Sequence, residues 1–247
     1  MSTHSLPLSK RHPSPQSEFW AGVRDIFPLV VGAIPFGIIF GSLAPASGFS
    51  VGGTLALSAI VFAGSSQFIA MGMMAAGTGG LLVVATAFVV NLRHLLYAVS
   101  LMPYVKSLSQ SWKGGLAFWL TDEAFAVAIS RYEADDRSLF KHWYHLGAAL
   151  AMYINWQLCT VLGVTAGQML PHAADWGLEF AMSVTFIGMV IPYLKTKPMG
   201  LAVAVSAAVA LLAYPLPHKL GLMVAAIAGI AAGVSSEHVL VSPKQPK

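Results

Sequence analysis

The sequence predicts an all-α protein, a polytopic membrane bundle of seven to eight transmembrane helices, and three observations lead to this prediction. Hydrophobic residues make up 56% of the 247 residues and charged residues only 10%, whereas a soluble domain carries about 25% charged residues. From Ile26 to Val234 the chain consists largely of uncharged apolar stretches, each close to the roughly 17–25 residues that cross a bilayer as a helix. Since the bilayer core offers no water to backbone N–H and C=O groups, these stretches must be helical.

Eight apolar segments follow one another along the chain. They cover residues 26–44, 52–76, 80–104, 114–130, 143–167, 178–194, 199–215 and 220–235. The fourth and the sixth are short, so seven crossings remain an alternative to eight. We expect some helices to be discontinuous, because Pro35 removes a hydrogen bond from the first and the Gly64-Ser65-Ser66 run weakens the second.

The two ends of the chain differ from the apolar part. Residues 1–22 are polar and proline-bearing, which predicts a flexible cytoplasmic tail. Residues 23–236 form the predicted transmembrane domain, and residues 237–247 form a short C-terminal tail. A signal peptide cleaved near residues 44–46 is the alternative, but the apolar run before that point is long and contains prolines.

The arrangement of the crossings can be predicted in part. With the N-terminus inside, Arg131, Arg137 and Lys141 fall in an inner loop, as the positive-inside rule favours. Met-Pro-Tyr-Val-Lys-Ser at residues 102–107 resembles Ile-Pro-Tyr-Leu-Lys-Thr at residues 191–196. The similarity suggests an inverted repeat of three helices, an arrangement common in transporters. Alternatively, both are ordinary helix ends with interfacial tyrosine and lysine.

Two apolar segments carry charges near their middles, Arg93-His94 in the third and Asp122-Glu123 in the fourth. Charges at membrane depth are costly and usually face a polar interior, which favours a transporter or a channel. Arg93 lies ten residues before Pro103, which is about 15 Å along a helix, and the two acids lie about 12–14 Å into their segment. These matched heights predict that Arg93 pairs with Asp122 or Glu123.

Other segments place polar groups at about the same depth. Ser65, Ser66 and Gln67 interrupt the second segment, Asn155 lies midway along the fifth, and Pro35 bends the first. Each of these groups, like the charged pair and the histidine, also has a structural explanation: bonding across helices or a buried ion pair. Their convergence at one depth favours a binding site.

The sequence lacks the motifs of several other functions. It has no phosphate-binding glycine loop and no metal-ligand spacing such as His-Glu-x-x-His, and no Ser/His/Asp arrangement can be recognised. We therefore expect no enzyme activity, no cofactor and no metal site. The net charge of +4 needs no nucleic-acid partner, because basic residues that flank membrane spans account for it.

Five blocks of this sequence resemble the AzlC family. They are Gly-Ala-Ile-Pro-Phe-Gly-Ile-Ile-Phe-Gly at 32–41, Val-Phe-Ala-Gly-Ser-Ser-Gln-Phe at 61–68, Asn-Leu-Arg-His-Leu-Leu-Tyr at 91–97, Ser-Leu-Met-Pro at 100–103 and Leu-Thr-Asp-Glu-Ala-Phe at 120–125. The resemblance covers most of the chain and is densest from Gly32 to Phe125. It implies a secondary transporter in the bacterial inner membrane that exports branched-chain and related hydrophobic amino acids, driven by the proton motive force. It also implies a small membrane partner of the AzlD type.

A zwitterionic amino acid needs a cation or N–H groups for its carboxylate and an acid or carbonyls for its ammonium group. The residues expected to bind substrate are Arg93, Asp122, Glu123, Gln67, Ser65, Ser66, Asn155 and Pro35. We expect the coupled proton on Asp122 or Glu123 rather than on His94. The rival functions are a channel, which would need rings of like groups, and a scaffold subunit that transports nothing itself.

Overall fold

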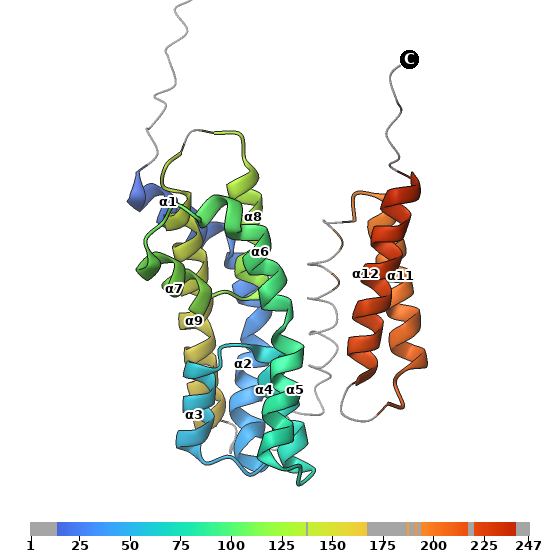
Figure 1. Ribbon diagram of the computed structural model, residues 1–247. Coiled ribbons are helices and arrows are strands. Elements are labelled where there is room, and N and C mark those ends of the chain that lie inside the picture. Colours follow the sequence, from blue (N-terminus) through green and yellow to red (C-terminus); the bar gives the residue numbers. More distant parts are fainter. Residues whose placement is uncertain are drawn as a thin grey trace, which may run out of the picture. The chain divides into compact units, whose positions relative to one another are not determined.

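The structure is a computed structural model that describes residues 14–136, 138–166, 187, 191, 194–216 and 220–240. Every regular element in this part of the chain is a helix, which confirms the all-α prediction (Figure 1). The helices are α1 Pro15–Asp25, α2 Phe27–Ala46, α3 Val51–Ile60, α4 Gly64–Ala75, α5 Gly80–Asn91, α6 Arg93–Val105, α7 Gln110–Phe118, α8 Asp122–Glu133, α9 Lys141–Ala166, α11 Lys197–Leu212 and α12 Leu220–Leu240.

Three described stretches are long and apolar enough to cross a membrane. They are Phe27–Pro45, Gly80–Val105 and Lys141–Ala166. Shorter apolar helices cover Val51–Ile60, Lys197–Leu212 and Val224–Glu237. The fold is therefore a membrane helix bundle. The sixth expected segment, residues 178–194, lies almost wholly outside the described residues, and so do two residues, 192 and 193, of the second copy of the suspected repeat. The number of crossings and the repeat both stay predictions.

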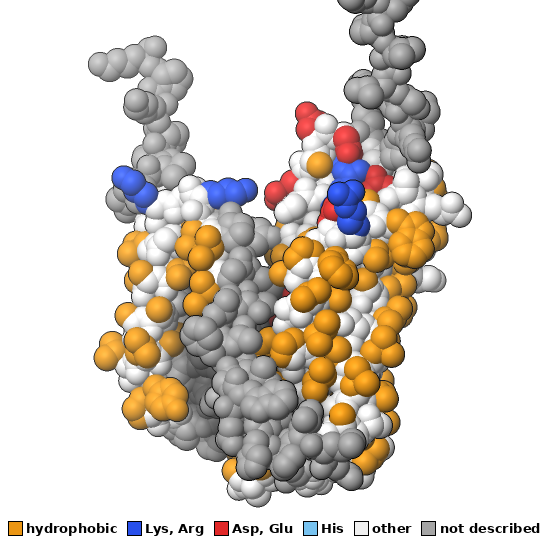
Figure 2. All heavy atoms as spheres, turned by 180° about the vertical axis from the view of Figure 1, so that it is seen from behind, with side chains coloured by type: hydrophobic (Ala, Val, Ile, Leu, Met, Phe, Trp, Pro, Cys, Tyr) orange, Lys and Arg blue, Asp and Glu red, His pale blue; other side chains and the backbone are white. Residues whose placement is uncertain are grey.

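Large hydrophobic side chains cover the flanks of the helices (Figure 2). Leu81 is 87% exposed and Leu211 is 78% exposed. Continuous apolar surface of this kind is unfavourable in water, but it matches the hydrocarbon of a bilayer. Charged side chains instead gather at the ends of the helices, most densely where α8 leads into α9 (Figure 2).

The chain divides into two compact units, which we name after one helix of each. The α8 unit comprises Met1–Val31 and Tyr97–Asn155, and the α4 unit comprises Gly32–Leu96 and Trp156–Lys247. Helices α2, α6 and α9 contribute residues to both units. Within the α4 unit, α11 and α12 pack side by side (Figure 1).

Three of the expected segments are each built from two helices, so the prediction of discontinuous helices is confirmed. The second segment breaks between α3 and α4, at the predicted Gly-Ser-Ser run. The third has a break at Leu92, and the fourth breaks at residues 119–121. We expected Asp122 and Glu123 near the middle of a continuous helix, and this is wrong, because they form the first turn of α8.

Residues 15–22, which we expected within a flexible tail, are helical and form most of α1. Ser14 and Ser17 cap the start of this helix reciprocally, and Pro15 occupies its first turn. Helix α1 also packs against α9, where a Cβ on Gly147 would collide with the backbone carbonyl of Phe19. Capping and packing together order residues whose polarity alone suggested a tail.

Pro35 does not interrupt its helix. Helix α2 is continuous from Phe27 to Ala46 and contains Pro35 and Pro45. Proline lacks an N–H, so the carbonyl of Val31 loses its usual helical donor even though the helix continues. The expected break of the first segment is therefore wrong.

Candidate functional site

The break between α3 and α4 is held together by one side chain, Gln67. Its amide nitrogen donates to the carbonyl of Val61 at 2.7 Å and to that of Leu57 at 3.4 Å, which supplies donors to the end of α3. Its own carbonyl oxygen accepts from Trp156 Nε1 on α9 at 3.1 Å. The side chain is fully buried. These are the cross-helix bonds given above as the structural explanation for Gln67.

Trp156 also packs against the first residue of α4. A Cβ on Gly64 would lie 3.0 Å from Trp156 Cη2, closer than side chains ordinarily approach. The indole stacks on Phe40 with ring centroids 6.4 Å apart, and Phe40 meets the edge of Phe68 at 6.1 Å. Aromatic rings therefore cover this side of the helix break, and glycine is the residue that permits their approach.

A polar cluster forms where the first turn of α4 meets the junction of α5 and α6. Arg93 Nη2 donates to Ser65 Oγ at 2.7 Å, and Ser66 Oγ donates to Asn91 Oδ1 at 2.7 Å. Helix α4 begins after Ala63 without a side-chain cap, and the first N–H groups of any helix have no partner within it. A cation and a helix start with its positive dipole end thus lie together, a combination suited to binding an anion.

His94 lies at the same junction. The helical bond pattern is disturbed there, because the N–H of Leu95 bonds to Leu92 O at 3.0 Å. His94 Nδ1 lies 3.2 Å from the carbonyl of Asn91. Since a carbonyl oxygen can only accept, this contact requires the tautomer with hydrogen on Nδ1. His94 thus supports the helix junction.

The acidic pair lies at the start of α8, in the α8 unit. Thr121 caps this helix, with Oγ1 accepting from the backbone N–H of Ala124 at 3.2 Å. Asp122 and Glu123 follow in the first turn and are both half-buried. Negative charge is favourable at a helix N-terminus. The fold therefore places two carboxylates at a helix start that favours negative charge.

Asn155 lies on α9 and contacts α2. Its Nδ2 donates to the carbonyl of Val30 at 3.3 Å. Val30 is next to Val31, whose carbonyl Pro35 deprives of a donor. Asn155 and Pro35 therefore mark a stretch of α2 whose helical hydrogen bonds are weakened.

The predicted site residues divide between the two units. Ser65, Ser66, Gln67, Arg93, His94 and Pro35 belong to the α4 unit. Gln67 lies at the break between α3 and α4, whereas Ser65, Ser66, Arg93 and His94 lie where the start of α4 meets the junction of α5 and α6. Asp122, Glu123 and Asn155 belong to the α8 unit. The pairing of Arg93 with an acid remains a prediction. Among the described residues, no group of three or more His, Cys, Asp or Glu side chains could hold a metal ion.

Three residues of this region were not predicted. Asn91 accepts from Ser66, and Trp156 closes the helix break. Trp119, immediately before the break in the fourth segment, has a buried indole N–H with no hydrogen-bond partner in the described part of the chain. Buried donors of this kind are rare and often functional. The available signal for Asn91 and Trp156 was their place near other polar residues within apolar segments.

Comparisons with known proteins identify the family to which the chain belongs. Residues 28–170 match the family described as AzlC protein. The inner membrane protein YgaZ of Escherichia coli is 32% identical over 190 residues, which cover 75% of this chain and 77% of that protein. No solved structure matches.

Two further relatives extend the match. The branched-chain amino acid transport protein AzlC of Bacillus subtilis is 27% identical over 213 residues, 81% of this chain and 82% of that protein. An uncharacterized membrane protein of Archaeoglobus fulgidus is 33% identical over 220 residues, 87% of this chain and 94% of that protein. The chain therefore belongs to the AzlC family of membrane proteins.

Proposed function

We propose that this chain is a secondary transporter that exports branched-chain and related hydrophobic amino acids from the cytoplasm. The observation that carries the proposal is Arg93 beside the uncapped start of α4, within helices whose surfaces are otherwise apolar. The name of the Bacillus subtilis relative supports the substrate class. A zwitterion carries one negative and one positive group, which suits a site with one cation and one acid.

The substrate carboxylate binds Arg93 and the N–H groups at the start of α4. Ser65 and Ser66 orient this end of the site through their bonds to Arg93 and Asn91. A guanidinium can bind a carboxylate through two parallel N–H···O bonds. Binding therefore competes with the bond from Arg93 to Ser65.

The substrate ammonium group binds Asp122 or Glu123, which we propose pair with Arg93 when substrate is absent. The carboxylate of an arriving substrate weakens the hold of Arg93 on the acid. The acid so released is the proposed carrier of the coupled proton. This exchange couples export to the proton gradient.

The transporter works with a small membrane subunit of the AzlD type in the bacterial inner membrane. The resemblance of the motifs at residues 91–97 and 120–125 to the family supports the partner, and the name of the Escherichia coli relative supports the membrane.

The test is the release of isoleucine from cells loaded with an isoleucine-containing dipeptide. Cells that express this chain with the small subunit should release isoleucine faster than cells with either chain alone or with an empty vector. Arg93→Gln should abolish the difference, whereas Lys106→Gln, at an exposed position after α6, should retain it. Equal release with the empty vector refutes transport, and full release with this chain alone refutes the partner requirement.

The same cells separate a carrier from a channel or a scaffold. A carrier should exchange internal labelled isoleucine for external unlabelled isoleucine, and its rate should saturate. Flux that rises linearly with concentration indicates a channel. Flux that persists with the small subunit alone indicates that this chain is a scaffold.

A further inference from the structure

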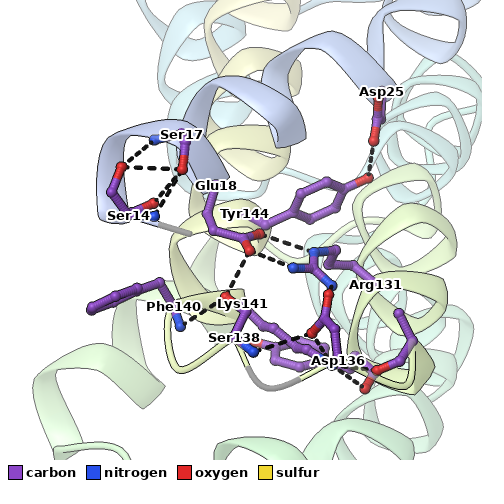
Figure 3. Close-up of polar contacts among 12 residues, drawn as sticks. Ser14, Ser17, Glu18, Asp25, Arg131, Asp136, Ser138, Phe140, Lys141 and Tyr144 are labelled. Carbon is purple, nitrogen blue, oxygen red and sulfur yellow. Dashed lines mark hydrogen bonds and ion pairs between the residues drawn. The ribbon is translucent and has the colours of Figure 1, made fainter. Parts of the chain in front are cut away.

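A buried ion pair joins α1 to the far end of α8 (Figure 3). Arg131 Nε donates to Glu18 Oε2 at 2.9 Å, and Arg131 Nη2 bonds to Glu18 Oε1. Ser138 Oγ donates to the same carboxylate at 2.7 Å. The Glu18 side chain is only 5% exposed and the Arg131 side chain 17% exposed. This two-point contact is the strong form of a charge-assisted bond.

The end of α8 has a second set of charges around it. Arg131 Nη1 bonds to Asp136 Oδ2 at 2.6 Å, and Lys141 Nζ lies 3.1 Å from Asp136 Oδ1. Lys141 also donates to the carbonyl of Ala134 at 2.6 Å, just beyond the last turn of α8. The C-terminus of α8 is thus tied both to α1 and to the start of α9.

Arg131 can leave Glu18 without becoming an unpaired buried charge. It shares its guanidinium between Glu18 and Asp136, so the second partner remains when the first is lost. Asp136 is 45% exposed, and water can solvate the rearranged charges. An ion pair with a replacement partner at hand is able to open, whereas an isolated buried pair is not.

Helix α8 connects this ion pair to the acids of the candidate site. The helix has twelve residues and is about 18 Å long. Its first turn carries Asp122 and Glu123, and its last turn carries Arg131. Non-helical residues flank it on both sides, at Thr121 and Ala134. Because a short helix is rigid along its length, contact at one end of α8 helps to set the position of the other.

We propose that the Glu18–Arg131 bridge is a latch that positions Asp122 and Glu123 through α8, and that it opens and closes as the protein works. The proposal rests on the proposed transport function. Glu18 and Arg131 are positioning residues, and they do not touch substrate. The structure holds the latch closed.

Opening can be measured without any substrate. Spin labels at Gln16→Cys and Ser130→Cys occupy exposed positions on α1 and α8, in a Cys159→Ala background because Cys159 is the one cysteine of the sequence. In proteoliposomes the full chain should show two distance populations. Glu18→Gln should increase the longer one several-fold, and the swap Glu18→Arg with Arg131→Glu should restore the shorter one. A single population, unchanged by Glu18→Gln, overturns the latch.

The same two cysteines test whether opening is needed for transport. A bis-methanethiosulfonate linker, matched to the shorter distance, holds α1 against α8 and can be removed by a reductant. In proteoliposomes that also contain the small subunit, linked protein should lose isoleucine export and regain it after reduction, while each single-cysteine variant treated in the same way keeps its export. Full export by linked protein shows a static strut and overturns the proposal. If unlinked protein exports nothing, the transport function fails, and the spin-label distances still decide whether the latch opens.

Discussion

Helices α4 and α8 both begin inside apolar segments, yet their first turns are built in opposite ways. Helix α8 is capped by Thr121 and carries two acids in its first turn, which oppose the positive end of the helix dipole. Helix α4 has no side-chain cap, and the charged group that contacts its first turn is the cation Arg93. The start of α4 thus favours binding of an additional anion, whereas the start of α8 stabilises the carboxylates of its own residues. Substrate carboxylate and proton can therefore be handled at different helix starts.

The largest effect is expected from removing the cation at α4. Arg93→Gln should weaken isoleucine binding by at least about 30-fold, because a hydrogen bond to a charged group contributes roughly 2 kcal/mol. Binding of labelled isoleucine to purified full-length protein measures this, with Lys106→Gln as the matched loss of charge. Unchanged affinity in Arg93→Gln would remove α4 from the binding site.

The next largest effect concerns the acids at α8. If one carries the coupled proton, either Asp122→Asn or Glu123→Gln should abolish export driven by a pH gradient while isoleucine exchange continues. Loss of one charge at a helix start costs only about 0.3–1 kcal/mol, so the amount of folded protein in the membrane should hold. A lower amount in both variants indicates a structural pair with Arg93. Normal expression and export against the gradient in both excludes either as the proton carrier.

Substitution of Gly64 tests whether Trp156 packs closely against the start of α4. Gly64→Ala should lower stability by about 1–3 kcal/mol, because the new methyl group forces the Trp156 ring to shift. The measurement is thermal unfolding in detergent. Gly72→Ala on the same helix meets open space and should change stability by no more than about 1 kcal/mol. Equal effects at the two positions would contradict the close approach.

Exchanging the caps sharpens the comparison directly. Thr121→Ala should destabilise the protein by about 1 kcal/mol through the lost cap of α8. Ala63→Ser offers α4 the cap it lacks and should stabilise it by a similar amount. Because that hydroxyl occupies N–H groups proposed to bind substrate, the same variant should bind isoleucine more weakly. Higher stability with unchanged affinity would show that the start of α4 takes no part in binding.

The smallest effect is the pH dependence at the other end of α8. Burial raises the pKa of Glu18, but hydrogen bonds from Arg131 and Ser138 outweigh it and hold the pKa below its ordinary value of 4.5. Desolvation also raises the pKa of Asp136, but bonds to Arg131 and Lys141 lower it to about 2. Both carboxylates therefore stabilise the closed arrangement when the pH is above their ordinary pKa values. This contribution is lost as the pH falls through their lowered pKa values.

The spin-label distances should accordingly stay constant from pH 8 to pH 5. The longer population should grow only in stronger acid, and Glu18→Gln should remove most of that change. A change in the spin-label distances near pH 6 would indicate that a group other than Glu18 or Asp136 controls the position of α1.

The break of the second segment could be predicted because Gly64, Ser65 and Ser66 weaken a helix wherever they occur. The break of the fourth could not be predicted from hydropathy, because Trp119 and Leu120 are as apolar as the helices around them. Thr121 followed by two acids is nevertheless a helix-start signal, which the length of the apolar run outweighed. Composition likewise hid α1, although Ser14, Pro15 and Ser17 carry a capping pattern.

The residue types that form the candidate site could be predicted from the sequence better than the contacts between them. Arg93, Ser65 and Ser66 could be identified because polar side chains are costly within apolar membrane segments and usually serve a function there. Their partners depend on how helices distant in sequence pack together. The bonds of Asn91 to Ser66 and of Trp156 to Gln67 follow only from such packing. Glu18, in a polar stretch, gave no sign of its partner more than 100 residues away.

Gln67 has a consequence for affinity. Its amide supplies hydrogen bonds to the end of α3 from within the protein, so the helix break does not need a bound molecule to exist. A ligand that had to unwind a helix would spend part of its interaction energy on that change. Here the open backbone is preorganised before any amino acid arrives. A substrate of the proposed class would then spend little of its interaction energy on unwinding a helix.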